Sequence, residues 1–244
     1  MAPLETLVRP IAGPDADVFV VVPRGGPLPP TTLPTPNDLI RGRLLVTVGL
    51  GLDGWSDSLV PGLPEKFRTV RAGDRVPTIA PTGPSDFRGA DGTPQNPYFW
   101  LDPERARLLV KAIAEEMARA DANHANAYRA RAGTFDADLS ALDAEVEGRM
   151  KPLATRTDLG AALSRDARFA YFAERYHLPS SLAAAGTVTR ASLDGFDPFG
   201  GADYASLVRL AASSVEALAR KAATPAPSAV DGTGDAGPGA PPSR

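Results

Sequence analysis

The feature that most constrains this fold is an amphipathic stretch without proline that runs from Asn123 to Lys151. Its apolar residues recur at steps of three and four: Tyr128, Ala132, Phe135, Leu139, Leu142, Val146 and Met150. This spacing predicts one continuous helix, which Pro152 ends. At about 1.5 Å per residue, such a helix extends roughly 43 Å. One small domain does not need that length, so we expect the helix to join two lobes.

Shorter patterns on both sides of this helix predict an α/β protein. Strands are predicted at residues 17–22, 44–48, 67–70, 76–80, 159–163 and 188–193. Helices are predicted at residues 39–43, 102–120, 123–151, 166–176 and 202–222. We therefore expect two lobes of short parallel sheet with flanking helices, joined by the long backbone helix. The C-terminal lobe is reduced, because the 71 residues 152–222 leave room for only about two βαβ units.

These elements divide the chain into four parts. Residues 1–121 form the N-terminal α/β lobe, residues 122–151 the linking helix and residues 152–222 the reduced C-terminal lobe. Residues 223–244 are rich in proline, glycine and alanine, and Val230 is their one large apolar residue. Such a segment cannot offset its ordering entropy, so we expect a disordered tail. A reduced sheet is marginal alone, so the C-terminal lobe has to lean on the helix and the first lobe.

Composition excludes several functional classes. The formal net charge is −3, so the chain lacks the basic excess that a nucleic-acid partner requires. Cysteine is absent and histidine occurs only at His124 and His177, which leaves no thiolate site and makes a multi-histidine metal site nearly impossible. No run of 18 apolar residues exists, so we expect no membrane insertion. No constellation of acids, bases and nucleophiles stands out, and we expect a protein that is not an enzyme.

Two loops have both a functional and an ordinary interpretation. The spacing from Gly49 to Gly54 fits G-x-G-x-x-G, but no crossover helix follows it, so a turn at a strand end is the better interpretation. Asp194 and Asp197 flank a glycine on one loop and could bind a cation. Such a loop is more often a simple Asx-turn.

Several segments, taken in order, resemble the metal-binding (zinc/manganese) substrate-binding proteins of ABC transporters. The family's N-G-L-G-L-E-G-W is similar to Val48-Gly49-Leu50-Gly51-Leu52-Asp53-Gly54-Trp55, and its D-P-H-x-W-L-D-P to Asn96-Pro97-Tyr98-Phe99-Trp100-Leu101-Asp102-Pro103. Its H-D-A-F-G-Y-F resembles Asp166-Ala167-Arg168-Phe169-Ala170-Tyr171-Phe172, and its L-D-P-L-G-G resembles Phe196-Asp197-Pro198-Phe199-Gly200-Gly201. Jointly these motifs are specific, and they cover about residues 3–222.

The resemblance implies a divalent metal, zinc or manganese, held by histidines and one aspartate. At the family's three histidine positions this chain has Pro30, Tyr98 and Asp166. Asp197 stands where the family's aspartate ligand would be. Zinc takes about four nitrogen, sulfur or oxygen donors, and two carboxylates do not supply them. We therefore expect Asp197 and Asp166 to be weak metal ligands at most, with Arg165 or Arg168 available to pair with Asp197 instead.

The functional prediction is a substrate-binding component of a metal-type ABC import system, with weakened or lost metal binding. The alternative is a non-transport accessory or interaction protein on the same scaffold. The resemblance implies an ABC transporter permease as partner and an extracytoplasmic location, in the periplasm or at the cell surface. The chain as written shows no export signal and no lipobox cysteine, so either it stays in the cytoplasm or a leader lies upstream. We expect a monomer.

Overall fold

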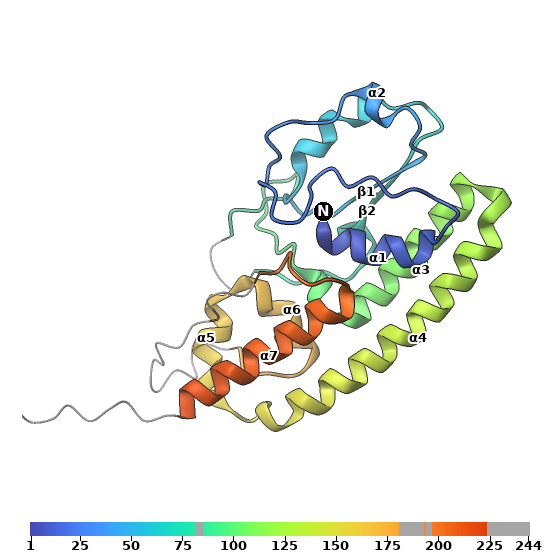
Figure 1. The fold of residues 1–244 in the computed structure, drawn as a ribbon. Coiled ribbons are helices and arrows are strands. Elements are labelled where there is room, and N and C mark those ends of the chain that lie inside the picture. Colours follow the sequence, from blue (N-terminus) through green and yellow to red (C-terminus); the bar gives the residue numbers. More distant parts are fainter. Residues whose placement is uncertain (82–84, 181–192, 194–196, 224–244) are drawn as a thin grey trace, which may run out of the picture.

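The structure is a computed structural model that describes residues 1–81, 85–180, 193 and 197–223 (Figure 1). The α-helices are α1 (Ala2–Ala12), α2 (Pro36–Leu39), α3 (Pro103–Ala120), α4 (Ala125–Met150), α5 (Gly160–Arg165), α6 (Ala170–Arg175) and α7 (Tyr204–Ala223). The strands β1 (Leu44–Thr47) and β2 (Arg68–Arg71) pair in parallel, Leu44 opposite Arg68. Short 3₁₀ turns lie at Gly54–Ser58, Val60–Gly62, Ala72–Arg75, Phe99–Leu101, Ala122–His124, Lys151–Leu153, Thr157–Leu159 and Ala167–Phe169.

Helix α4 is the backbone of the molecule, as its sequence pattern predicts. It is continuous over 26 residues and packs against α3, α1 and α7 (Figure 1). Six of the seven residues of the predicted apolar stripe are buried, and Phe135 is partly buried against the core. The residues N-terminal to α4 pack on one end of it, and α7 runs along the other end. The prediction of a long helix that connects both parts is confirmed.

One continuous hydrophobic core connects the two parts of the chain. It includes Leu7 of α1, Trp100 before α3, Phe172 of α6 and Leu207 of α7, all fully buried. The described C-terminal residues contain helices only, and they lean on α4 and on the N-terminal part through this core. The α/β class is confirmed, although helices outweigh the two-stranded sheet. None of the helices among the described residues is both long and apolar enough to cross a membrane.

Four predicted elements differ from the structure. Residues 17–22 and 76–80 are not strands: their composition favours a strand, but strand formation depends on pairing, and β1 pairs with β2 alone among the described residues. Residues 159–163 are not a strand but belong largely to α5, because a short apolar run fits either state and two central alanines favour a helix. The short helix predicted at 39–43 is α2, which starts earlier because Thr35 caps it.

Helix α1 has no counterpart in the sequence prediction. Its buried residues Leu4, Leu7 and Ile11 keep the helical spacing, but prolines at Pro3 and Pro10 weaken that signal. Pro3 falls in the first turn, where proline is tolerated. The predicted strand at 188–193 lies, except for Leu193, outside the described residues, and so does the predicted disordered tail from residue 224 onward.

Replacing Gly133 or Gly148 with alanine should stabilise the protein. Both glycines lie inside α4, and a Cβ added at either would meet nothing within 4 Å. Alanine in a helix interior is favoured over glycine by about 1 kcal/mol. We expect each variant to raise the free energy of unfolding by about 0.5–1 kcal/mol in urea titrations.

Gly51→Ala is the matched control for these two variants. Gly51 has φ +79° and a Cβ there would lie 2.4 Å from the Arg88 carbonyl oxygen. That variant should therefore destabilise the protein. Stabilisation by Gly51→Ala, or destabilisation by Gly133→Ala, would contradict this account of the two backbone environments.

Candidate functional site

The predicted site residue Tyr98 lies in an aromatic cluster where the N-terminal and C-terminal parts meet. Its ring packs at 5.4 Å from Trp100, 5.9 Å from Phe87 and 6.5 Å from Phe199, measured between ring centroids. Tyr98 comes directly before the 3₁₀ turn that leads into α3. Phe199 belongs to the segment before α7. The cluster therefore holds residues 197–199 against the N-terminal part.

A hydrogen bond fixes the same contact. The indole Nε1–H of Trp100 donates to the carbonyl oxygen of Pro198 at 2.9 Å, and the Trp100 side chain is completely buried. A buried indole N–H needs a partner, and here the partner comes from a residue 98 positions later in the chain. The loop that carries Asp197 is thereby placed near Tyr98.

Asp166 forms a two-point ion pair with Arg168. The Asp166 Oδ1 accepts from the Arg168 Nε–H at 2.7 Å, and Oδ2 accepts from Nη2–H at 2.5 Å. Asp166 also caps the 3₁₀ turn Ala167–Phe169 by accepting the backbone N–H of Arg168 at 3.1 Å. Its side chain is 16% exposed. Arg168 supplies a positive charge here, as predicted for Arg165 or Arg168, but the carboxylate with which it pairs is Asp166, whereas the prediction named Asp197.

The charges of Arg168 and Asp166 both affect the pKa of the Tyr98 phenol. Burial raises the pKa of the Tyr98 phenol above its ordinary value; the Arg168 charge opposes this rise, and Asp166 and Asp86 add to it. The phenol therefore stays protonated at physiological pH. A protonated phenol is a poor ligand for a divalent metal, because a metal ligand has to give up its proton.

The other two predicted site residues, Asp197 and Pro30, have no described contact with the Asp166–Arg168 ion pair. The Asp197 carboxylate is exposed and accepts the backbone N–H of Phe199 at 2.9 Å, which is the Asx-turn expected for this loop. Asp194 lies outside the described residues. Pro30 is partly buried in the loop before α2, and none of the hydrogen bonds or ring contacts of the described residues joins it to the other three. Tyr98 and Asp166 are thus close, the Asp197 segment adjoins them, and Pro30 remains apart in the described contacts.

The donor set does not form a metal centre in the part of the chain that the structure describes. Within it, no group of three or more His, Cys, Asp or Glu side chains is placed to hold a metal ion. The cationic partner of Asp166 is instead a guanidinium, whose fork matches a carboxylate at two points.

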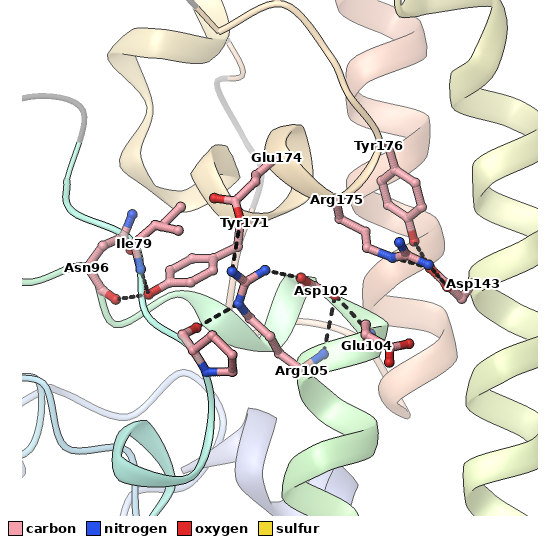
Figure 2. A network of polar contacts seen from close by, with 11 residues as sticks. Ile79, Asn96, Asp102, Glu104, Arg105, Asp143, Tyr171, Glu174, Arg175 and Tyr176 are labelled. Carbon is pink, nitrogen blue, oxygen red and sulfur yellow. Dashed lines mark hydrogen bonds and ion pairs between the residues drawn. The ribbon is translucent and has the colours of Figure 1, made fainter.

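A second polar network joins the N-terminal and C-terminal parts of the chain (Figure 2). The sequence analysis did not predict it. Arg105 of α3 pairs with Asp102, donates to Glu174 of α6 at 3.0 Å and to the Pro77 carbonyl oxygen at 2.8 Å. Its guanidinium also lies 4.7 Å from the centre of the Tyr171 ring. One side chain therefore connects three separate segments of the chain.

The Tyr171 hydroxyl completes this clamp. It donates to the Asn96 carbonyl oxygen at 2.9 Å and accepts the Ile79 N–H at 3.2 Å (Figure 2). The Asn96 side chain reaches back to the C-terminal part by donating to the Ala167 carbonyl oxygen at 3.0 Å. Bonds that run in both directions between the two parts hold them in one relative position.

A third group of polar side chains lies between α4 and α6. Asp143 accepts from the Arg175 Nε–H at 3.0 Å and from the Tyr176 hydroxyl at 3.0 Å (Figure 2). The sequence holds a signal for this site: Asp143 falls between Leu142 and Val146 on the buried face of α4. A carboxylate on an apolar stripe predicts a buried partner.

The glycine-rich segment 49–54 is a turn at a strand end, as predicted, and its acidic residue has a structural role. Asp53 is buried, and its two carboxylate oxygens accept the backbone N–H groups of Val48 at 2.6 Å and Gly49 at 2.7 Å. Burial raises the pKa of Asp53, while these N–H groups act in the opposite direction. The turn closes the end of β1 and holds no phosphate-binding helix.

The family comparison covers most of the chain. Residues 1–210 match the family model described as "ZnuA: Zinc-uptake complex component A periplasmic". The high-affinity zinc uptake system protein ZnuA of Brucella abortus (strain 2308) is 33% identical over 92 residues. That alignment covers 38% of this chain and 25% of the Brucella protein, so the matched part spans about a quarter of this relative.

Solved structures have the same fold. A ZnuA deletion mutant with zinc bound has a TM-score of 0.65 at 19% identity, covering 92% of this chain and 97% of that one. The substrate-binding protein FpvC of Pseudomonas aeruginosa, in complex with Mn²⁺, has a TM-score of 0.60 at 26% identity. The matched region covers 74% of this chain and 65% of the FpvC chain. The match over residues 1–210 shows that this chain belongs to the family of periplasmic zinc-uptake complex components A, the ZnuA family.

Proposed function

We propose that this chain is the substrate-binding component of a metal-type ABC import system, and that it does not hold zinc or manganese tightly. Its partner is an ABC transporter permease, and its working location is outside the cytoplasmic membrane. The proposal rests on membership of the zinc-uptake family and on the donor set around Tyr98 and Asp166. Two lobes, residues 1–121 and 152–222, with the linking residues 122–151 between them, are the units that would contact the permease.

The Asp166–Arg168 pair is the observation that carries the weak-binding part of the proposal. A metal ion at Asp166 has to displace the Arg168 guanidinium, which donates one hydrogen bond to each carboxylate oxygen, at N···O distances of 2.7 and 2.5 Å. It also has to accept the protonated Tyr98 phenol as a neighbour. Asp197 offers a carboxylate that is exposed and already accepts a backbone N–H. Two carboxylates so occupied suit, at best, a weakly held and hydrated hard cation.

Isothermal titration of the full chain with zinc and with manganese tests this proposal. We expect no heat that corresponds to a dissociation constant below about 10 μM, which is about 7 kcal/mol of binding free energy. Sub-micromolar zinc affinity that is lost in Asp197→Ala would contradict the weak-binding proposal and place the ligands at this aspartate. Pull-down of a neighbouring permease by the full chain tests the transport role separately, because it does not depend on metal.

Restoring imidazoles at the family positions should restore zinc binding. We expect the double variant Tyr98→His/Asp166→His to bind zinc at least tenfold more tightly than the unchanged chain, because two neutral nitrogen donors then replace a phenol and a carboxylate paired with Arg168. The control is Tyr98→Phe/Asp166→Asn, which disturbs the same positions but adds no nitrogen ligand. Equal zinc affinity in both variants would contradict the placement of the site.

A further inference from the structure

Asn96 is a buried polar residue that lies between the two segments of the candidate site. It is 1% exposed and comes two residues before Tyr98 in the chain. Its side chain contacts the 3₁₀ turn Ala167–Phe169, which follows Asp166 directly. Asn96 is therefore next to one candidate site residue in sequence and next to another across the contact between the N-terminal and C-terminal parts.

Both polar atoms of the Asn96 side-chain amide are used in this contact. The Oδ1 accepts the backbone N–H of Tyr98 at 3.1 Å, and the Nδ2–H donates to the Ala167 carbonyl oxygen at 3.0 Å. One planar group thus joins the backbone of Tyr98 to the backbone of the residue after Asp166. The two ends are not exchangeable, because the N–H of Tyr98 needs an acceptor and the carbonyl group of Ala167 needs a donor.

The backbone on both sides of the Asn96 side chain is held in place. The Asn96 carbonyl oxygen accepts from the Tyr171 hydroxyl at 2.9 Å, and this hydroxyl also accepts the Ile79 N–H at 3.2 Å (Figure 2). The Gln95 N–H donates to the Phe87 carbonyl oxygen at 2.9 Å. These bonds fix the direction in which the amide of Asn96 points.

Asp166 holds the other side of the contact. Its carboxylate accepts the backbone N–H of Arg168 at 3.1 Å and thereby caps the turn Ala167–Phe169. The Arg168 guanidinium binds the same carboxylate, which keeps the cap in place. The carbonyl group of Ala167 lies in this turn, so the acceptor that Asn96 needs is oriented by a candidate site residue.

We propose that Asn96 is the positioning residue of the candidate site, and that it fixes Tyr98 relative to Asp166 whether or not an ion is bound. This inference rests on the proposed function, since it concerns the regulation of the same site. The donors and acceptors that make the contact all belong to the chain, and Asn96 is buried, where an unpaired polar group is unfavourable. A permease then meets the same arrangement of the two parts with and without metal.

Residue-resolved amide exchange of the metal-free full chain tests this proposal. Asn96→Asp keeps the shape and the acceptor for Tyr98 but places an oxygen where the donor to Ala167 was, and Asn96→Leu removes both groups. We expect the Tyr98 amide to exchange at least tenfold faster in Asn96→Leu and to stay within threefold of the unchanged chain in Asn96→Asp. The amides of residues 168 and 169 should exchange at least tenfold faster in both variants.

Glu174→Ala is the matched control for the two Asn96 variants. It removes another hydrogen bond between the two parts, the one from Arg105 at 3.0 Å, and leaves the Asn96 amide intact. We expect the amides of Tyr98 and of residues 168 and 169 to stay within threefold of the unchanged chain. Equal acceleration of these amides in Asn96→Asp, Asn96→Leu and Glu174→Ala would overturn the proposal, because any loss of contact would then have the same effect. Unchanged exchange in Asn96→Leu would overturn it as well.

Zinc affinity separates a positioning role from a purely structural one. In the double variant Tyr98→His/Asp166→His, adding Asn96→Leu should weaken zinc binding at least tenfold, because the two imidazoles lose their fixed separation. Adding Glu174→Ala should change that affinity less than threefold. Equal weakening by both additions would overturn the positioning role of Asn96.

A last arm measures exchange in the unchanged chain with an excess of zinc or manganese. We expect the amides of Tyr98 and of residues 168 and 169 to stay within threefold of the metal-free rates, and a larger change would overturn the proposal. Tight zinc binding with unchanged exchange would contradict only the weak binding in the proposed function. A double variant that binds no zinc would contradict only the placement of the ligand site, and the exchange of the Asn96 variants then decides the role of Asn96.

Discussion

Trp100→Ala should destabilise the protein by about 3–5 kcal/mol, the range for removing a large aromatic side chain from a core. The Trp100 side chain is completely buried and contacts the rings of Tyr98, Phe99 and Phe199. Its loss leaves a large cavity and also removes the only described hydrogen-bond donor to the Pro198 carbonyl oxygen. Urea unfolding followed by circular dichroism measures the change in the free energy of unfolding.

Trp100→Phe separates the two contributions. Phenylalanine keeps most of the apolar contact but cannot donate to Pro198, so we expect a loss of about 1–2 kcal/mol. Because Pro198 adjoins Asp197, this variant should also speed amide exchange in residues 197–200. A Trp100→Ala loss below 1 kcal/mol would contradict the role of Trp100 as the anchor between the two parts of the chain.

The elements that the sequence predicts well are those in which one local pattern decides the structure. The stripe of α4 and the Asp102-Pro103 start of α3 are both found, because periodicity and capping act within a few residues. The turn at Gly49 to Gly54 is found for the same reason.

The predictions that fail concern residues whose state depends on distant partners. Residues 17–22 have the composition of a strand but pair with none of the described strands, and nothing in those six residues reveals this. Leu159 to Leu163 is apolar in a way that fits either a strand or a helix. Local patterns do not encode which of these partners is present.

In the candidate site, too, the sequence motifs indicate which residues take part, but they do not predict which residues pair with one another. The resemblance placed Tyr98, Asp166 and Asp197 in motifs, and the structure brings the first two close together beside the segment of the third. The choice of Asp166 over Asp197 as the partner of Arg168 depends on the 3₁₀ turn Ala167–Phe169, which places the arginine two residues from the aspartate that caps it. The Arg105 clamp joins residues 69 positions apart, a distance at which no local pattern predicts a partner.

Asp143→Ala should also be strongly destabilising, by about 3–4 kcal/mol. The Asp143 side chain is 9% exposed and accepts hydrogen bonds from Arg175 and Tyr176. Burial raises the pKa of Tyr176 far above its ordinary value, and the Asp143 charge adds to this, so the hydroxyl remains a donor that needs an acceptor. Removing the carboxylate leaves that hydroxyl and the Arg175 charge without compensation between α4 and α6.

The matched control for Asp143→Ala is Glu145→Ala on the same helix. Glu145 pairs with Arg209 of α7 at 2.6 Å, but the two side chains are 40% and 49% exposed. Exposed pairs contribute about 0–1 kcal/mol, because water screens the charges and two long side chains lose rotamer freedom. Both variants remove one carboxylate that pairs α4 with a neighbouring helix, so a difference in unfolding free energy isolates the effect of burial. Equal losses in the two variants would show that the Asp143 cluster is as well hydrated as the surface pair, and that α6 is held to α4 by apolar packing alone.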